Sequence, residues 1–300
     1  MGSKKSTKAK GSRAGSLSAG RPPTAAKPKA SVSAKATRTV INKLHQINKQ
    51  LVRAKSAGNE AQVKDLQTQV DALGGLPRYQ QASIQGQSIE RGGDSSLVLM
   101  QWLKDAGVVG QLKTSHARLK LLEVGALSIK NACATSGIFD VQRIDLHSQA
   151  DGILQQDFME RPIPQTGEEK FHIISLSLVL NFVPDAEGRG EMLRRTCQFL
   201  ERNQIGDGSS ETAATHYPSL FLVLPAPCVT NSRYMDEKRL TLLMAHLGYS
   251  LIQRKQTTKL VYYLWHWKPI LELKRQGFAK TQVNPGVTRN NFAIVLKRSK

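Results

Sequence analysis

The sequence has few of the features that mark secreted, metal-bound or membrane proteins. Its 300 residues include only three cysteines, Cys133, Cys197 and Cys228, which lie far apart and show no paired metal-ligand spacing. Such a sparse, odd set favours a reducing compartment over a disulfide framework, and we expect no metal site. No apolar run reaches the roughly 18–20 residues that span a bilayer, and the N-terminus lacks the apolar core of a secretory signal. We therefore expect a protein of the cytosol or nucleus.

Acidic residues are missing from the start of the chain. Residues 1–55 contain 14 Lys or Arg, and the first acid is Glu60. The rest of the chain has 29 basic and 23 acidic residues, so most of the formal charge of +20 lies in this segment. A basic tail attracts polyanions by counterion release. Before Val40 the only large apolar residues beyond Met1 are Leu17 and Val32, which favours nucleic acid over a membrane as the partner.

Two segments precede the region that resembles a folded domain. Residues 1–36 are Lys, Ser, Ala, Gly and Pro in loose order, and we expect a disordered tail. Its clusters Lys4-Lys5 and Lys27-Pro28-Lys29 fit a nuclear or nucleolar signal and a solvated tail without a receptor equally well. Residues 37–96 contain two stretches with helical spacing, separated at Gly58-Asn59, and then a polar connection. The two predicted helices can pack on each other or on the domain at 97–300; their run is short for a coiled coil.

Short apolar runs alternate with helical stretches from about residue 118 onward. Asp94 or Ser95 is expected to cap a helix that starts near Leu97, and further helices are expected at 186–202 and 232–247. The pattern predicts an α/β fold with a mostly parallel sheet covered on both faces. No helix separates the last two runs, so an antiparallel hairpin is expected to close the sheet. The predicted strands are 119–124, 141–146, 152–155, 172–178, 220–224, 259–265 and 292–296.

The first predicted strand ends in a glycine turn that is typical of cofactor sites. Leu121–Ser128 predicts a strand, a sharp turn at Gly125 and a helix start, with Glu123 and Gly125 as candidate cofactor-binding residues. Asp145 stands twenty residues after Gly125, at the end of the second strand. A carboxylate there can accept hydrogen bonds from ribose hydroxyls and would repel a phosphate, which favours an adenosine-type ligand. The full G-x-G-x-x-G pattern is absent, and an ordinary strand turn with a capping Asp remains the alternative.

Polar and aromatic residues also follow the third and fourth predicted strands. Asp157 can bond the exocyclic amine of an adenine while Phe158 packs against its ring; the alternative is an ordinary turn. Ser177 and Asn181 stand at the carboxyl end of the fourth strand, where ligands of open α/β sheets bind. Each of these two could equally satisfy nearby backbone groups. Phe182 follows Asn181 directly, and core packing is one role open to it.

Several long runs closely resemble the fungal 25S ribosomal RNA adenine-N1 methyltransferases. The two most specific are DFMERPIP (157–164) and FHIISLSLVLNFVP (171–184). The same family is indicated, in the same order along the chain, by GGLPRYQQASIQGQ (74–87), RGGDSS (91–96), LLEVGALS (121–128) and RNNFAIVL (289–296). The resemblance covers about residues 74–298 and leaves out the basic tail.

The resemblance implies a Rossmann-like class I methyltransferase with a mostly parallel seven-stranded sheet and an antiparallel last strand. S-adenosylmethionine is expected at the strand carboxyl ends, and the family's binding positions fall on Gly125 and Asp145, with Asp157 and Phe158 in its adenine-side run. The implied substrate is ribosomal RNA or a pre-ribosomal particle, which places the protein, expected as a monomer, in the nucleolus.

The absence of one sequence motif indicates which atom of the adenine is methylated. The Asp/Asn-Pro-Pro-aromatic run of N6-adenine enzymes is absent, and Asn181-Phe182-Val183-Pro184 is only a distant echo of it. This favours a ring nitrogen, for which we expect Asn181 and Phe182 to line the base pocket, with Tyr234 as another stacking candidate. The competing hypothesis is an S-adenosylmethionine-binding sensor or scaffold without transferase activity, which would have no need of the basic tail.

Overall fold

A computed structural model describes residues 57–74, 93–148, 150–201, 216–270 and 277–298, with some isolated positions between 39 and 55. The predicted disordered tail at 1–36 and most of the polar connection at 75–92 lie outside the described residues. The domain boundaries drawn at 36 and 96 therefore remain predictions. No helix in the described ranges has both the length and the apolar character that crossing a bilayer requires.

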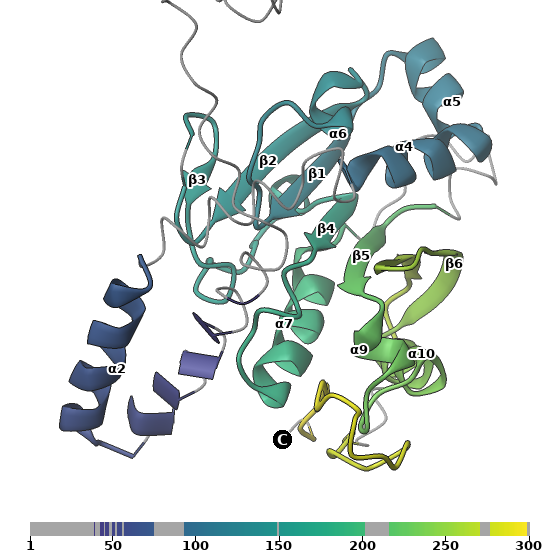
Figure 1. Ribbon diagram of the computed structural model, residues 1–300. Coiled ribbons are helices and arrows are strands. Elements are labelled where there is room, and N and C mark those ends of the chain that lie inside the picture. Colours follow the sequence, from purple (N-terminus) through teal and green to yellow (C-terminus); the bar gives the residue numbers. More distant parts are fainter. Residues whose placement is uncertain are drawn as a thin grey trace, which may run out of the picture.

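The centre of the fold is a seven-stranded sheet with the strand order β3-β2-β1-β4-β5-β7-β6 (Figure 1). The first five strands are mutually parallel, and β7 runs antiparallel to both β5 and β6. This confirms the expected α/β class with a mostly parallel sheet. The strands are β1 (Leu119–Val124), β2 (Phe139–Asp145), β3 (Leu154–Gln155), β4 (Ile173–Ser177), β5 (Ser219–Pro225), β6 (Tyr249–Gln256) and β7 (Leu260–Trp267).

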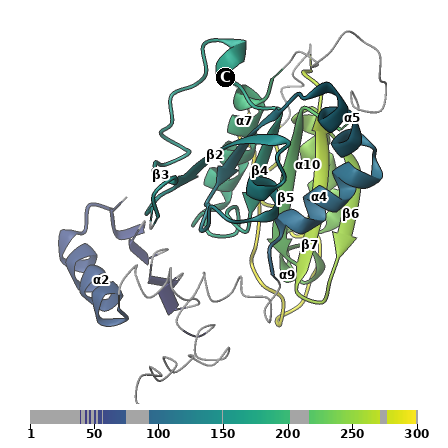
Figure 2. The same ribbon diagram turned by 90° about the horizontal axis from the view of Figure 1, so that it is seen from above.

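Helices cover both faces of the sheet because its central strands are apolar on both sides. In β5, Phe221 and Val223 face one core cluster, whereas Leu220 and Leu222 face the other. The first cluster includes residues of α4 (Ser96–Asp105), α5 (Val108–Ser115) and α6 (Ala132–Thr135). The second includes α7 (Ala186–Phe199), α9 (Pro227–Thr230) and α10 (Glu237–His246). Figure 2 shows α4 and α5 on the opposite side of the sheet from α7 and α10.

The closing hairpin differs from the one expected. It consists of β6 and β7, whereas the sequence predicted a pair formed by 259–265 and 292–296. The run at 249–256 escaped notice because β6 is an edge strand with polar residues and a register shift between Leu251 and Gln253. The run at 292–296 is apolar because it packs on α7: Val295 N donates to Ala186 O at 2.8 Å. A Cβ on Gly190 would lie 1.8 Å from Val295 O, so the two backbones are in direct contact.

The two N-terminal helices pack on each other. The second, α2 (Glu60–Ala72), starts at Asn59, whose side chain accepts a hydrogen bond from Gln62 N. Helical positions of the first helix form a small cluster with α2, in which the buried members are Ile47, Leu51, Ala54 and Leu66. Among the described residues this cluster contains no side chain of the sheet domain. The sequence left open whether these helices pack on each other or on the domain at 97–300, and the structure shows them packed on each other.

Candidate functional site

The carboxyl ends of the parallel strands meet at one edge of the sheet. The register pairs Val124 of β1 with Ile144 of β2 on one side and with Leu176 of β4 on the other. The next residue of each strand is a predicted site residue: Gly125, Asp145 and Ser177. The chain order reverses between β1 and β4, and ligands of open α/β sheets bind at such a switch point. The structure thus brings three of the predicted residues to one edge.

The turn after β1 requires glycine for two reasons. Gly125 has a φ of 74°, in the left-handed region, and a Cβ at this position would lie 2.5 Å from Val179 Cγ2. Its N–H donates to Ile144 O at 2.8 Å, which ties the turn to β2. Leu178, after β4, also has a positive φ of 58°, which costs a leucine about 1–2 kcal/mol. Two sharp turns are therefore packed against each other at the switch point.

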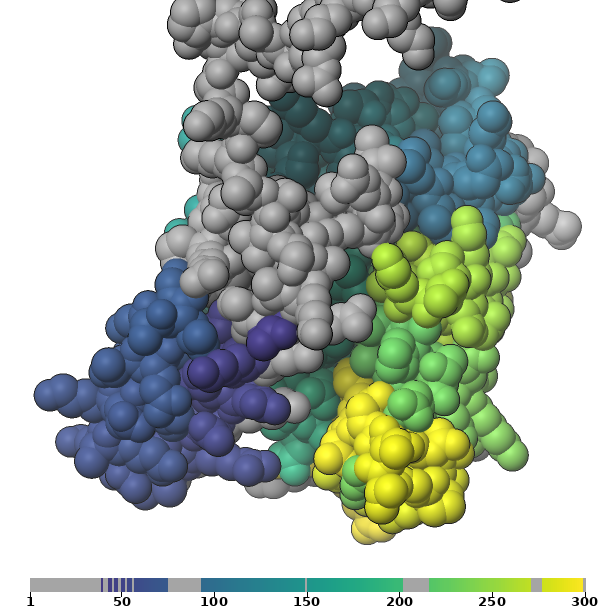
Figure 3. All heavy atoms as spheres, in the orientation of Figure 1, coloured from purple at the N-terminus to yellow at the C-terminus, as the bar shows by residue number. Residues whose placement is uncertain are grey.

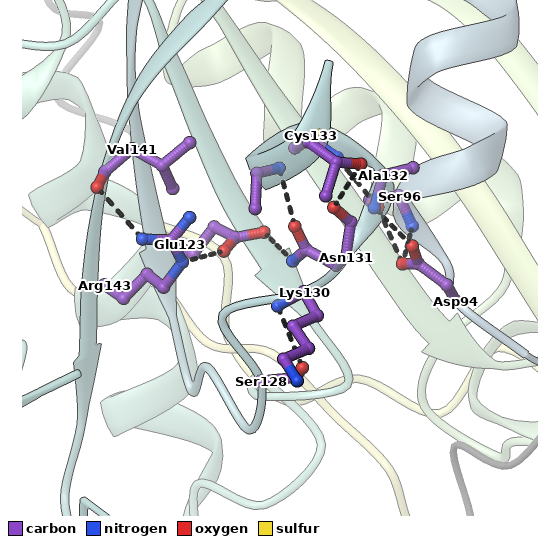
Figure 4. A network of polar contacts seen from close by, with 12 residues as sticks. Asp94, Ser96, Glu123, Ser128, Lys130, Asn131, Ala132, Cys133, Val141 and Arg143 are labelled. Atoms are coloured by element: carbon purple, nitrogen blue, oxygen red, sulfur yellow. Dashed lines mark hydrogen bonds and ion pairs between the residues drawn. The ribbon is translucent and has the colours of Figure 1, made fainter. Parts of the chain in front are cut away.

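Glu123 holds the loop after β1 rather than reaching into solvent. Its side chain is buried, with 7% exposed, and Asn131 Nδ2 donates to its Oε1 at 2.6 Å. Arg143 Nε of β2 lies 3.4 Å from Oε2 as an ion pair. Burial raises the pKa of Glu123, opposed by the Asn131 hydrogen bond and by the charge of Arg143. Figure 4 shows the three side chains converging from β1, β2 and the loop.

Asp94 joins the start of α4 to the start of α6. Its Oδ1 accepts from Ser96 N at 2.9 Å and from Ser96 Oγ at 2.6 Å, and its Oδ2 accepts from Ala132 N at 2.6 Å (Figure 4). The neighbouring Ser95 Oγ lies 2.8 Å from Ser177 Oγ at the end of β4. Of the two predicted caps of α4, Asp94 makes the bond, and the side chain of Ser95 makes none to the helix. Ser177 is thus bonded within the protein.

Asp145 keeps one carboxylate oxygen available. Its Oδ1 accepts from His147 N at 2.8 Å, and within the described ranges its Oδ2 makes no hydrogen bond or ion pair. Two apolar side chains in the loops after β1 and β2 are unusually exposed, Ile129 by 40% and Leu146, the residue after Asp145, by 55%. Ile129 Cγ2 approaches Gly152, just before β3: a Cβ there would lie 3.4 Å away. An open carboxylate beside exposed apolar groups has the chemistry to bind a ribose and a flat apolar ring.

Asp157 and Phe158 are placed differently from each other. Asp157 Oδ1 accepts from Met159 N at 2.7 Å, so this side chain shapes its own turn. Phe158 is 3% exposed and its ring centre lies 5.2 Å from that of Phe199 on α7. Arg195 Nε donates to Phe158 O at 2.7 Å, which fixes the backbone as well. The Phe158 ring therefore belongs to the core, and the structure does not bring it to the surface at this edge.

Asn181, in the turn after β4, has a side-chain oxygen without a hydrogen-bond partner among the described residues. Its Oδ1 is buried and accepts no hydrogen bond, although such a group costs about 1–3 kcal/mol when unpaired. The cap of the following helix α7 is Asp185, whose Oδ1 accepts from Gly188 N at 2.6 Å. Phe182 is half-buried next to it, and its N–H donates to Val179 O at 2.9 Å. Asn181 is thus not occupied by the capping role that sequence left open.

The sequence comparisons show the family. The profile described as 25S rRNA (adenine(2142)-N(1))-methyltransferase, Bmt2, matches residues 64–294. The chain belongs to this family. A 25S rRNA adenine-N(1) methyltransferase of Schizosaccharomyces pombe is 38% identical over 85% of this chain and 89% of its own length. A 25S rRNA (adenine(2142)-N(1))-methyltransferase of Saccharomyces cerevisiae is 35% identical over 85% of this chain and 71% of its own. The resemblance stated from the sequence is confirmed.

Among solved structures the likeness is looser. An O-methyltransferase from neocarzinostatin biosynthesis, in complex with S-adenosylmethionine and 2-hydroxy-5-methyl naphthoic acid, has a TM-score of 0.43 and 10% identity. The match covers 78% of this chain and 71% of that one. The fold is established by the strand order given above. The predicted enzyme class, an S-adenosylmethionine-dependent methyltransferase, is the class of the family to which the chain belongs.

The residues at this edge fit S-adenosylmethionine. Asp145 Oδ2 is an open acceptor for a ribose, Leu146 and Ile129 offer exposed apolar surface, and the glycine turn lets the backbone approach a ligand closely. Among the residues that the structure describes, no His, Cys, Asp and Glu side chains gather in a set that could hold a metal ion.

The sequence alone missed two parts of this site. Leu146 is the last residue of the predicted strand 141–146 and Ile129 lies in no predicted element, and only their exposure distinguishes them. The bond from Ala132 N to Asp94 joins residues 38 positions apart, which no local pattern could indicate. The sequence indicated Asp94 as a possible helix cap and as part of the run RGGDSS (91–96), but neither signal pointed to its bond with the loop after β1.

Proposed function

We propose that this protein transfers a methyl group from S-adenosylmethionine to N1 of an adenine in large-subunit ribosomal RNA. The observation that carries the proposal is family membership over residues 64–294, joined to an unpaired buried Asn181 Oδ1 at the switch point. When bound, the cofactor supplies an electrophilic methyl group on a sulfonium. Gly125, Asp145, Ile129 and Leu146 would hold it.

Asn181 has the chemistry to select adenine and leave N1 free. An asparagine amide can bond adenine at N6 and N7 together, accepting from the amine and donating to the ring nitrogen. This pair lies on the Hoogsteen edge, so N1 on the Watson–Crick edge stays open. The buried Oδ1 of Asn181 would then gain the donor that it lacks in the free protein. Because N1 is on the pairing edge, the adenine must be unpaired or flipped out.

The reaction needs positioning more than proton transfer. Adenine N1 carries a lone pair in the ring plane and needs no deprotonation before it attacks a methyl group. The residues of the chain therefore act by aligning the base and by keeping water out. Glu123 is buried and committed to Asn131 and Arg143, so it supports the loop and is not a general base. Phe182, half-buried beside Asn181, supplies a face on which the base can stack.

Primer extension on ribosomal RNA tests the proposal. A methyl group on N1 blocks base pairing, so reverse transcriptase stops one nucleotide before the modified adenine. Total RNA from a deletion strain is expected to lack one large-subunit stop, and the purified protein with S-adenosylmethionine should restore it. If calorimetry shows S-adenosylmethionine binding but no RNA regains the stop, the protein is a cofactor sensor or scaffold and not a transferase.

The oligomeric state and the cellular location of the protein belong to the same proposal. We infer that the protein works as a monomer on a pre-ribosomal particle in the nucleolus, because its substrate is made there and its first 55 residues carry 14 basic side chains without an acid. A fluorescent fusion should concentrate in the nucleolus, and its variant lacking residues 1–36 should spread through the cell. Equal nucleolar enrichment of both would refute a targeting role for the tail.

A further inference from the structure

The C-terminal part of the chain is a second basic segment without acids. Residues 273–300 contain seven Lys or Arg and no Asp or Glu. One of these, Lys297, pairs with Glu187 of α7 at 2.6 Å. Within the described ranges, Lys280 and Arg289 form no ion pair with a carboxylate. No carboxylate among the described residues therefore neutralises the positive charge of either of these two side chains.

This segment forms a loop that leaves the body of the protein and returns to it. Phe278 and Leu296 close its base, with N–O distances of 2.8 and 3.1 Å in the two directions. Residues 279–291 between them are named here the C-terminal loop. It contains Val287, a large apolar side chain that is 93% exposed. Figure 3 shows the yellow segment on the outer surface of the molecule.

Arg233 gives the C-terminal loop its shape. Its guanidinium donates to three backbone carbonyls, those of Gly286 at 3.0 Å, Val287 at 3.3 Å and Arg289 at 3.0 Å. Its own carbonyl accepts from Val283 N at 2.8 Å and from Asn284 N at 3.1 Å. The side chains of Asn284 and Asn290 also donate to the body of the protein, to Ser232 O at 3.1 Å and to Pro227 O at 2.7 Å, whereas Lys280 and Val287 are exposed. The tip is thus held in one shape while presenting exposed groups.

The C-terminal loop lies at the same edge of the sheet as the proposed base pocket. Arg233 follows β5 and α9, and Ser232 pairs with Asn290 in a bridge, so the loop is attached beyond the carboxyl end of β5. That strand is the direct neighbour of β4, whose end leads into Asn181. Adjacent strands are about 4.8 Å apart, so the attachment point is on the β4 side of the switch point and away from β2 and Asp145.

The side chains of the loop have the chemistry that recognises a phosphodiester backbone. Lys280 Nζ lies 4.3 Å from the ring centre of Tyr234. The ammonium group therefore covers one face of that ring, and this cation–π contact holds it in place. Arg289 Nε donates to Pro285 O at 3.2 Å, and its terminal nitrogens have no partner among described residues. Two cations without counter-ions, held on an ordered loop, suit an extended polyanion.

We propose that the C-terminal loop is the docking surface for the RNA strand that flanks the target adenine, with Lys280 and Arg289 contacting its phosphates. The proposal rests on the proposed function and adds to it the surface that holds the substrate. Asn181 selects the base, whereas the loop binds the adjacent backbone without reading its sequence. Tyr234, with one face under Lys280, is then a support for that cation and not a base-stacking residue.

The test compares two double variants of the full-length protein, each of which removes two positive charges. The variant Lys280→Gln with Arg289→Gln removes the proposed phosphate contacts. The control, Lys104→Gln with Lys113→Gln, removes two exposed cations from α4 and α5, which lead to the amino-terminal edge of the sheet. Binding to a labelled single-stranded RNA is measured over a range of salt concentrations, and KM is measured for methyl transfer to 25S rRNA from a strain that lacks the modification.

The loop variant should lose about 0.7 of the salt slope for each phosphate contact, about 1.4 in all, and its KM for RNA should rise several-fold. S-adenosylmethionine affinity, Tm and kcat should stay at wild-type values, and the control pair should bind RNA as the wild type does. Unchanged slope and KM in the loop variant, or equal losses in the control pair, would overturn the proposal. The binding measurement decides this even if the wild type transfers no methyl group, a result that would overturn the proposed function instead.

Discussion

The two sides of the switch point are built in opposite ways. On the β1 side the polar groups are bonded to one another: Asn131 donates to Glu123, and Ala132 N donates to Asp94. On the β4 side Asn181 Oδ1 is buried with no donor, and its neighbour Leu178 has a left-handed backbone. On the first side a network of side chains holds the loop, and its buried Glu123 Oε2 and Arg143 Nε still face each other as an ion pair at 3.4 Å, whereas the buried Asn181 Oδ1 on the second side faces no charged or hydrogen-bonding partner among the described residues.

From this difference we expect the β1 side to bind the cofactor and the β4 side to bind the target base. A loop held by internal hydrogen bonds is ready to bind a cofactor without rearranging, which lowers the entropy cost of binding. An unpaired buried oxygen destabilises the free protein but gains a partner when a base arrives. Substitutions in the glycine turn after β1 should therefore change cofactor affinity and stability together, whereas Asp145 should affect cofactor affinity alone and Asn181 should affect transfer alone.

The largest effect is expected from Gly125→Ala. The new Cβ would meet Val179 Cγ2 at 2.5 Å, and the left-handed backbone adds about 1–2 kcal/mol of strain. We expect a loss of about 2–4 kcal/mol of unfolding free energy from both causes, with S-adenosylmethionine binding too weak to detect by calorimetry. Adding Val179→Ala should recover the part due to overlap and leave the backbone strain. A fully stable Gly125→Ala with normal affinity would refute this account of the turn.

Asn181→Ala should slow methyl transfer without harming the fold. A bidentate contact to adenine contributes about 1–3 kcal/mol, so kcat/KM for RNA should fall roughly tenfold to a hundredfold. Unfolding free energy should be unchanged or slightly higher, because the variant removes an unpaired buried oxygen. Transfer rate and chemical unfolding are measured on the same preparation.

Asp185→Ala is the matched control for Asn181→Ala. It removes the bond from Gly188 N that caps α7, which should cost about 1 kcal/mol of stability while the folded fraction transfers at the normal rate. If Asn181→Ala instead lowered stability and left transfer intact, Asn181 would be structural and the base-pocket proposal would fail.

Asp145→Asn should weaken the cofactor and nothing else. Asparagine keeps an oxygen that can accept from His147 N, so the turn survives, but the charge that strengthens bonds to the ribose is lost. The difference between charged and neutral hydrogen bonds is about 1 kcal/mol, which predicts roughly a fivefold to tenfold rise in Kd for S-adenosylmethionine by calorimetry. Asp140→Asn, at the opposite end of β2, controls for the change in net charge and should bind normally.

The smallest effect is a pH dependence carried by Glu123. Because burial raises its pKa above 4.5, the folded state holds this proton more tightly than the unfolded state does. Its contribution to stability is therefore greatest below 4.5 and declines as pH rises toward the folded-state pKa. Glu123→Gln does not titrate, so its unfolding free energy relative to wild type should increase over that pH range. Denaturant unfolding at several pH values measures it, and a constant difference would refute the prediction.

Much of the fold could be predicted because its signals are local. The apolar run at Leu119–Val124 matches β1 to the residue, and the Gly58-Asn59 break precedes α2 as expected. A strand buried on both faces must be apolar throughout, and a reversal needs a residue that tolerates a positive φ. The edge strand β6 was not predicted, because one of its faces is polar and the register shift at Leu251 disrupts the alternation of polar and apolar residues.

The sequence by itself determined the family, the parallel sheet and the positions of Gly125 and Asp145, because strand periodicity and turn chemistry act over a few residues. Only the tertiary structure decided which polar atoms are occupied. Arg189 donates to Ala293 O at 2.8 Å across 104 residues, and Arg233 binds the C-terminal loop across more than 50. Such partners meet only when packing closes long stretches of chain. Whether Asn181 is satisfied or left open to a ligand is therefore a property of the assembled fold.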